Sequence, residues 1–253
     1  MNIPKVYSIG DYKIIRFDEI DSTNEYAWNL LSNSNPKENV VIIAENQTAG
    51  KGQYGRKWET DRGENIIMTT IKSPNFLKAR DAFHLNVITS LTIIDMLQAL
   101  SNEEFIVKWP NDIYFGNKKI AGVLIKNKIQ DGLIKQSIIG TGININQVSF
   151  PKELKNPISL YQITKEKYVI EEAIQLILKG YDHYFKMVES KRMDKIYNGY
   201  NEKLFGKNEW RSFFVSGEKK ELKILNVSQN GSLSLESKDG SIVEYNAGLE
   251  YVI

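Results

Sequence analysis

The segment 47–58 combines glycines and basic residues in the way that anion-binding loops do. Three glycines within six positions let the backbone approach a ligand closely. Three cations lie in the same segment, and exposed amides together with cations form a cradle whose usual anion is phosphate. These residues are Gly50, Gly52 and Gly55, with Lys51, Arg56 and Lys57. The alternative is a basic surface loop between two strands.

The spacing Gly50-x4-Gly55 is not that of a working P-loop. Arg56 and Lys57 occupy the positions of the P-loop lysine and of the serine or threonine that binds Mg²⁺. Because the hydroxyl ligand of the metal is missing, we reject the P-loop interpretation.

A second polar segment is Lys108-Trp109-Pro110-Asn111-Asp112, which follows a short apolar run. The proline fixes the turn, so Asn111 and Asp112 leave the strand end with little freedom. A carboxylate held there can bind Mg²⁺, which prefers one or two carboxylates plus substrate phosphates. Taken alone, the segment fits an Asx-type turn better, in which Asp112 satisfies only local amides.

Two further segments place single polar residues on expected strands. Lys119 begins an apolar run, and a lysine beside a phosphate loop can stabilise charge that develops on a transferring carboxylate. Most lysines at hairpin turns are merely solvated, however. The segment Gly140-Thr141-Gly142-Ile143-Asn144 is an incomplete glycine motif that favours a strand with close backbone packing. Asn144 is then the polar group placed to contact a ligand.

Composition excludes several classes of protein. The 253 residues include no cysteine, which excludes disulfide scaffolds, zinc fingers and thiol nucleophiles. The histidines, His84 and His183, are too few for a multi-histidine metal site, and neither has partners for a catalytic triad. A net charge of +2 gives no global case for nucleic-acid binding.

No membrane or export segment is expected. The most apolar stretch, 83–100, contains His84, Asn86 and Asp95, which argues against a bilayer span. Residues 1–5 lack the basic-then-apolar pattern of a signal peptide. We therefore expect a soluble, cytoplasmic protein with no membrane partner.

The elements that must position these residues alternate between strand and helix. Ser22 and Glu25 have the spacing of a capping box, which predicts a short helix starting at Ser22. Apolar residues at helical spacing predict two longer helices, 83–97 and 169–188. Gly116-Asn117-Lys118 has the composition of a hairpin turn between two of the strands. The predicted strands are 40–44, 66–71, 105–108, 113–115, 120–126 and 138–145.

After about Phe205 the pattern changes to closely spaced short strands. Asn230-Gly231 and Asp239-Gly240 are hairpin turn pairs between three of them. This arrangement predicts an independent small β-barrel, with a boundary near Gly206. The predicted strands are 209–215, 221–227, 232–237, 242–245 and 249–252.

Five motifs in one order make the chain resemble a biotin protein ligase (biotin–[acetyl-CoA-carboxylase] ligase). Each motif alone is modest, but the shared order and spacing are highly specific and cover essentially the whole chain. The motifs are Ser22-Thr23-Asn24, Gln47 with 50–58, Lys108-Trp109-Pro110-Asn111-Asp112, Lys119-Ile120-Ala121-Gly122, and Gly140-Thr141-Gly142-Ile143-Asn144.

The resemblance implies an α+β fold in two domains. Residues 1–205 would form a mixed sheet flanked by helices, the class II synthetase-like catalytic domain of biotin and lipoate ligases. Residues 206–253 would form an SH3-like barrel. The implied reaction uses biotin, ATP and Mg²⁺ to make biotinyl-5′-AMP, and then transfers biotin to one lysine of a biotin carboxyl carrier domain.

The resemblance also implies roles for individual residues. Ser22, Thr23 and Gln47, with Asn24 in the same motif, resemble contacts to the biotin ureido ring. The backbone of Lys51, Gly52 and Gln53 resembles the loop that closes over biotin. Lys119 resembles the lysine at the biotin carboxylate and α-phosphate, and Asp112 a Mg²⁺ and phosphate organiser. Residues implied at ATP or the adenylate are Arg56, Lys57, Trp58, Lys108, Asn111 and Asn144, of which Arg56 is also assigned to catalysis with Lys119 and Asp112.

The sequence departs from the family pattern at two places. Relatives with an arginine-rich loop have arginine at the positions of Lys51, Gln53 and Tyr54, so how tightly the adenylate is shielded is open. Bifunctional relatives carry a winged helix before the Ser-Thr-Asn motif, whereas 21 residues precede Ser22 here. We therefore expect a monofunctional ligase without specific DNA binding, and a homodimer is one state that the sequence leaves open. The alternatives are a lipoate–protein ligase and a non-catalytic biotin- or nucleotide-binding module.

Overall fold

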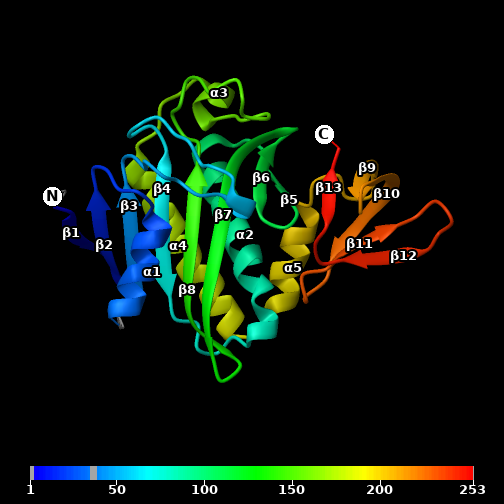
Figure 1. The fold of residues 1–253 in the computed structure, drawn as a ribbon, viewed down its shortest axis with the longest axis horizontal. Coiled ribbons are helices and arrows are strands. Elements are labelled where there is room, and N and C mark those ends of the chain that lie inside the picture. Colours follow the sequence, from blue (N-terminus) through cyan, green and yellow to red (C-terminus); the bar gives the residue numbers. More distant parts are fainter. Residues whose placement is uncertain (1–2, 35–38, 253) are drawn as a thin grey trace.

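The fold consists of two sheets with helices on both faces of the larger one (Figure 1). The computed structural model describes residues 3–34 and 39–252. Residues 1–2, part of the N-terminal segment 1–5, and residue 253 lie outside the described residues. The larger sheet has the strand order β1-β2-β3-β4-β8-β7-β6-β5. It is mixed, because β2 and β3 are parallel and β4 is antiparallel to both of its neighbours. Its strands are β1 (Lys5–Ile9), β2 (Tyr12–Phe17), β3 (Asn39–Ala44), β4 (Ile66–Lys72), β5 (Ile106–Lys108), β6 (Asp112–Phe115), β7 (Lys118–Gln130) and β8 (Leu133–Ile143).

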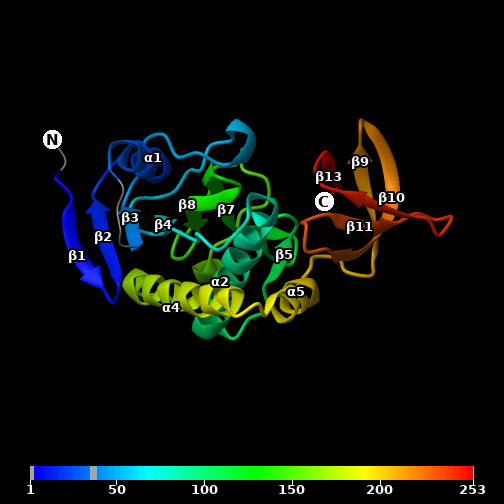
Figure 2. The same ribbon diagram turned by 90° about the horizontal axis from the view of Figure 1, so that it is seen from below.

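Helices divide between the two faces of this sheet (Figure 2). Helix α1 (Thr23–Asn33) lies on one face, against β3, β4 and β8. On the other side lie α2 (Phe83–Ser101), α4 (Ile170–Glu189) and α5 (Met193–Glu202). The short helix α3 (Leu160–Thr164) follows the loop after β8.

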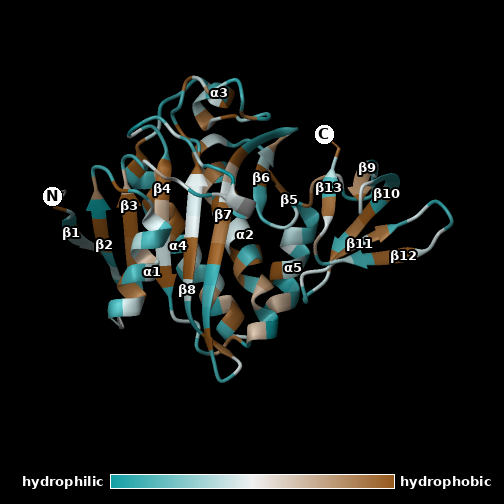
Figure 3. Ribbon diagram, in the orientation of Figure 1, coloured by the Kyte–Doolittle hydropathy of each residue, from teal (hydrophilic) through white to brown (hydrophobic). Residues whose placement is uncertain are grey.

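Alternation along the central strands creates a separate hydrophobic core on each face. Successive side chains of a strand point to opposite faces. Val41 and Ile43 of β3 belong to the main core, whereas Val40 and Ile42 belong to a smaller core with Ala27 of α1. A strand buried on both sides, such as β3, is therefore hydrophobic along most of its length, as its brown colour in Figure 3 shows. The smaller core holds α1 against the sheet through Ala27 and Leu31.

Helix α2 is long and apolar enough to cross a membrane, despite His84, Asn86 and Asp95. The 18-residue window that passes this test lies in 79–101 and is 67% buried inside the protein. The burial identifies α2 as a core helix of this fold rather than a membrane span.

The five strands after Gly206 form one antiparallel sheet, in the order β12-β11-β10-β9-β13. This sheet lies beyond the β5 edge of the larger one (Figure 1). Its core is continuous with the main core, and the Trp109 indole donates to the Gly231 carbonyl across the junction, at 3.0 Å. The small sheet is thus packed firmly onto the larger unit. The strands are β9 (Trp210–Val215), β10 (Glu218–Val227), β11 (Leu233–Glu236), β12 (Ile242–Tyr245) and β13 (Leu249–Tyr251).

All the predicted strands and helices form, with shifted ends. Strand β8 ends at Ile143 rather than 145, because the Asn144 amide turns to donate to Ile120. The sequence patterns did not predict β1, β2, α3 or α5. The capping box was half right: Ser22 Oγ accepts from the Glu25 amide at 3.4 Å, but the Glu25 carboxylate binds lysines instead of returning to Ser22.

Candidate active site

The face of the larger sheet beneath α1 carries glycines where large side chains approach the backbone. Gly122 and Gly142 are paired in register between β7 and β8, and Gly140 lies two residues before Gly142. A Cβ atom at Gly142 would overlap the indole of Trp58, and one at Gly140 would overlap the carboxamide of Asn24. Glycine is therefore required for these side chains to lie on the sheet.

Next to Gly140 lies a cluster of neutral polar side chains. Gln47 Oε1 accepts from the Thr23 amide at 2.8 Å and from the Thr23 hydroxyl at 3.1 Å. The Thr69 hydroxyl lies 2.8 Å from that of Thr23 and 2.7 Å from Asn24 Oδ1. Thr23, Asn24 and Thr69 are all buried. Fixed neutral donors and acceptors of this kind suit a ligand with its own N–H and C=O groups.

Sequence reasoning missed Thr69. The alternation of β4 offers a signal, because Thr69 lies two residues before Ile71, which belongs to the smaller core beneath α1. A polar residue on that otherwise apolar face is atypical of a core position, and Thr69 contacts Thr23 and Asn24 of the Ser22-Thr23-Asn24 motif.

The glycine loop forms a short hairpin over the sheet. Its ends are joined by hydrogen bonds from the Trp58 amide to Gly50 and from the Gly52 amide to Arg56. At its tip, the turn 53–55 brings Gln53 Nε2 within 3.3 Å of Asn111 Oδ1. The side chains of Arg56 and Lys57 are exposed. The loop therefore connects two motifs that lie more than fifty residues apart in the sequence.

Glu25 holds this loop to the rest of the site. Its Oε1 accepts from Lys51 of the loop at 3.2 Å and from Lys126 of β7 at 3.0 Å. Hydrogen bonds from Lys126 and then Lys51 lower the pKa of the Glu25 carboxyl group. The first turn of α1, the glycine loop and β7 thus share one carboxylate.

Cationic side chains gather on the other side of Trp58. Lys119 Nζ lies 2.7 Å from Asp112 Oδ1 and 5.8 Å from the centre of the Trp58 ring. Asp112 is also the register partner of Lys108. Burial lowers the pKa of Lys108; Asp112 opposes this shift, while Lys119 and Arg56 add to it. Asp112 thus lies beside two lysines, while the positive charge of Arg56 acts on Lys108.

Two predicted ligand contacts have structural partners within the chain. Asn111 is buried, and its Nδ2 lies 3.1 Å from both Asn86 Oδ1 and the Val123 carbonyl. Asn144 Nδ2 donates to the Ile158 carbonyl at 3.0 Å, which holds the loop after β8 against the sheet. Both side chains are therefore engaged within the protein, and Asn111 also lines a pocket.

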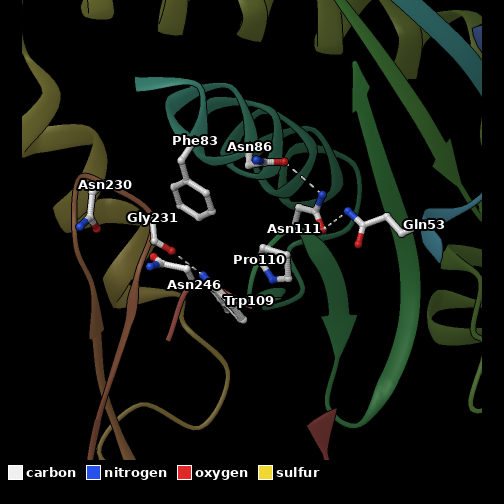
Figure 4. Close-up of a pocket in the computed structure, with 9 residues that line it drawn as sticks. All are labelled: Gln53, Phe83, Asn86, Trp109, Pro110, Asn111, Asn230, Gly231 and Asn246. Atoms are coloured by element: carbon white, nitrogen blue, oxygen red, sulfur yellow. Dashed lines mark hydrogen bonds between the residues drawn. The ribbon is translucent and has the colours of Figure 1, made fainter. Parts of the chain in front are cut away.

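A pocket of about 540 Å³ lies between the turn 109–111, the start of α2 and the C-terminal sheet (Figure 4). Gln53 and Asn111 reach it from the predicted site, while Phe83, Asn230 and Asn246 are contributions that the sequence did not predict. Among residues 3–34 and 39–252, no group of three or more His, Cys, Asp or Glu could hold a metal ion.

Fold and site together define an enzyme of the ligase type, with a mixed sheet beneath a cationic glycine loop. Residues 16–144 match the model of the Biotin/lipoate A/B protein ligase family. The chain belongs to this family.

Relatives and solved structures agree with this assignment. The chain is 30% identical over 260 residues to the bifunctional ligase/repressor BirA of Bacillus spizizenii, covering 97% of this chain and 76% of that protein. It is 29% identical over 120 residues to the biotin–[acetyl-CoA-carboxylase] ligase of Mycobacterium tuberculosis, covering 46% of this chain and 42% of the relative. The biotin protein ligase of Aquifex aeolicus, solved with biotin and ATP, superposes with a TM-score of 0.79 at 27% identity, covering 94% of this chain and 99% of that one.

Proposed function

We propose that the protein is an ATP-dependent biotin protein ligase. The observation that carries the proposal is the arrangement of two compartments on one sheet face. Neutral polar groups gather around Thr23 and Thr69, and cations gather around Asp112, with the Trp58 indole between them. Biotin has the same two ends, a neutral ureido ring and a carboxylate, and ATP adds further negative charge.

The reaction follows from this arrangement. A carboxylate is a poor electrophile until one of its oxygens becomes part of a good leaving group. In the first step a biotin carboxylate oxygen attacks the α-phosphorus of ATP, and pyrophosphate leaves. In the second, the ε-amine of a carrier lysine attacks the carbonyl of the mixed anhydride, and AMP leaves. Fixed cations lower the barrier to the first step by offsetting the charge that two anions bring together.

Individual roles follow the two compartments. We assign the ureido ring to Thr23, Asn24 and Gln47. Ser22 caps the start of α1, which carries Thr23 and Asn24. The backbone of 51–53 closes over biotin. Lys119 contacts the biotin carboxylate and the α-phosphate, supported by its position beside Trp58. The residues assigned to ATP or the adenylate are Arg56, Lys57, Trp58, Lys108, Asn111 and Asn144.

Mg²⁺ would enter with the nucleotide. It is commonly bound by one or two carboxylates, with substrate phosphates supplying other ligands. Asp112 provides one such carboxylate, and its contact with Lys119 is made through Oδ1. The donor set therefore fits a metal carried by ATP rather than one held by the protein alone.

The acceptor we propose is the biotin carboxyl carrier domain of a carboxylase such as acetyl-CoA carboxylase, supported by the activity named for the Mycobacterium tuberculosis relative. The requirement for ATP supports a cytoplasmic location. The catalytic part would comprise residues 1–205 and the C-terminal part residues 206–253.

A net charge of +2 supports the absence of specific DNA binding. A salt-sensitive gel shift on the promoter of its own operon at sub-micromolar protein would contradict this last point.

One experiment tests the main proposal. Protein, ATP and Mg²⁺ are incubated with biotin or with lipoate, and pyrophosphate release is measured. A carrier domain is then added and analysed by mass spectrometry for a modified lysine. We expect release with biotin and a biotinylated carrier. Release with lipoate alone would make the protein a lipoate ligase, and biotin binding without pyrophosphate would make it a binding module.

A further inference from the structure

Lys108 is held between two aromatic rings that come from different sheets. Its Nζ lies 5.2 Å from the ring centre of Tyr114 on β6 and 4.8 Å from that of Tyr251 on β13. Tyr114 belongs to the same sheet as Lys108, whereas Tyr251 belongs to the C-terminal sheet. The C-terminal sheet therefore contributes a side chain to the cationic side of the site.

The charges around Lys108 explain why contacts with two aromatic rings are needed to hold its side chain. Lys119 and Arg56 repel the Lys108 ammonium group, while Asp112 and Glu250 attract it. Asp112 is already paired with Lys119. Without a further attraction, the flexible lysine side chain would move away from the other two cations toward solvent. Two aromatic faces supply that attraction, because the ring quadrupole draws a cation toward the ring face.

Tyr251 is itself firmly placed. Strand β13 pairs with β9, where Tyr251 lies opposite Phe213. The Tyr251 ring lies 4.8 Å from that of Phe213 and 6.0 Å from that of Phe205, measured between ring centres. Its hydroxyl group is buried and has no hydrogen-bond partner among the residues that the structure describes. The ring, rather than the hydroxyl group, is thus the part of Tyr251 that contacts the site.

We propose that Tyr251 is a positioning residue for the ligase reaction, which holds the Lys108 ammonium group in place for the phosphates of ATP. The inference rests on the proposed ligase function. It assigns the C-terminal sheet a specific part in nucleotide binding, through one ring and one lysine.

The test compares Tyr251→Leu, which removes the ring, with Tyr251→Phe, which removes only the hydroxyl group. Biotin-dependent pyrophosphate release is measured against ATP and against biotin. A cation–π contact of ordinary strength predicts that Tyr251→Leu raises KM for ATP by about three- to thirtyfold, with KM for biotin within twofold of wild type. Tyr251→Phe should match wild type in both. Phe214→Leu is the control, because Phe214 is an exposed aromatic residue of the neighbouring strand.

A double-mutant cycle separates positioning from packing. Lys108→Met alone should raise KM for ATP, and adding Tyr251→Leu to it should raise KM no further. An unchanged KM for ATP in Tyr251→Leu, a loss in Tyr251→Phe equal to that in Tyr251→Leu, or full additivity would each overturn the inference. Should Tyr251→Leu fail to fold, Tyr251→Met replaces it in the same cycle. A wild-type protein that releases no pyrophosphate would instead refute the proposed function.

Discussion

The ammonium nitrogen of Lys119 lies 2.7 Å from Oδ1 of Asp112, so this lysine already has a counter-ion. Both side chains are partly exposed, at 28% and 29%. An ion pair that water reaches contributes at most about 1 kcal/mol to stability. Its main effect is therefore to fix the direction of the Lys119 side chain, beside Trp58 and Gly122.

Replacing Lys119 by alanine should cripple adenylation. As the biotin carboxylate approaches the α-phosphorus, two negative groups come together, and an ammonium group between them offsets the repulsion. One such contact in a closed site is commonly worth about 3 kcal/mol or more. At about 1.36 kcal/mol per decade, the rate should fall roughly a hundredfold or further. Biotin-dependent pyrophosphate release measures this rate.

The neighbouring Lys118→Ala is a matched control, because Lys118 is exposed on the same strand. It should leave the rate unchanged. Lys119→Arg should rescue only in part, since a planar fork does not reproduce a compact point charge. Adenylation by Lys119→Ala within threefold of wild type would remove this lysine from the mechanism, and a collapsed thermal melt would make its role structural.

Gln53→Arg should slow the escape of biotinyl-adenylate. Gln53 contacts Asn111, directly before Asp112, and a neutral amide there cannot make the charge-assisted contact to phosphate that an arginine makes. The dissociation rate of the intermediate, measured by chasing labelled adenylate, is the readout. A rate equal to or faster than that of wild type would mean that another contact retains the adenylate.

Glu25→Gln should speed the release of biotin and of the adenylate by a few-fold. The glutamine loses the charge that holds Lys51 of the glycine loop and Lys126 of β7 together. The effect is limited because these side chains are substantially exposed. Glu189→Gln, in an exposed position at the end of α4, is the control. High salt should bring the wild-type release rates toward those of Glu25→Gln. Release rates that salt does not change would argue against a role for the Glu25 ion pairs.

The contribution of the Glu25 ion pairs to the stability of the folded protein depends on pH with a definite sign. The Lys126 and Lys51 contacts lower the pKa of Glu25, so its carboxylate is stabilised in the folded protein. The contribution is fully present above the ordinary glutamate pKa of about 4.3 and is lost as the pH falls through the lowered pKa. Release rates that depend on Glu25 should therefore be constant from about pH 5 to 8. A Glu25-dependent change within that window would contradict this assignment.

Much of the fold could be predicted because its signals are local. Strands β3 and β4 are buried along nearly their whole length, and α4 shows helical periodicity within a single window. Helix α2 is instead a long apolar segment that is buried on most sides. Strand β1 was missed because it lies at the sheet edge and most of its positions are exposed, so it has no clear hydrophobic pattern. Strand β2 is mostly buried, but Lys13 and Arg16 interrupt its apolar residues. Helix α5 was missed because its segment is mostly polar. Its buried face has only three residues, Ile196, Tyr197 and Tyr200, which give too weak an apolar pattern.

The site was predictable as motifs but not as contacts. Asn111 and Asp112 lie in one motif, yet Asn111 is engaged by Asn86 and Val123, while Asp112 binds Lys119. These partners are set by the packing of α2 and β7, which local patterns do not specify. Tyr251 reaches Lys108 across more than 140 residues of sequence, through a junction between sheets. Such contacts require the fold itself.

Thr69→Val should weaken biotin binding without unfolding the protein. The substitution keeps the shape of the side chain but removes the hydroxyl group that contacts Thr23 and Asn24. A buried polar atom that loses its partner costs about 1–3 kcal/mol. Because the cluster is no longer held in one arrangement, the Kd for biotin should rise about tenfold, equivalent to about 1.4 kcal/mol. Isothermal titration calorimetry measures this change.

The next residue provides the control for this prediction. Thr70 is as fully buried as Thr69, but alternation along β4 turns it to the opposite face of the sheet. Its hydroxyl group has no hydrogen-bond partner among the residues described. Thr70→Val therefore removes a buried polar group that makes no hydrogen bond among the described residues. The melting temperature should stay equal or rise, and the affinity for biotin should not change. Equal losses of affinity in Thr69→Val and Thr70→Val would show that β4 responds to any change in packing, and that the Thr69 hydroxyl has no specific part in the biotin site.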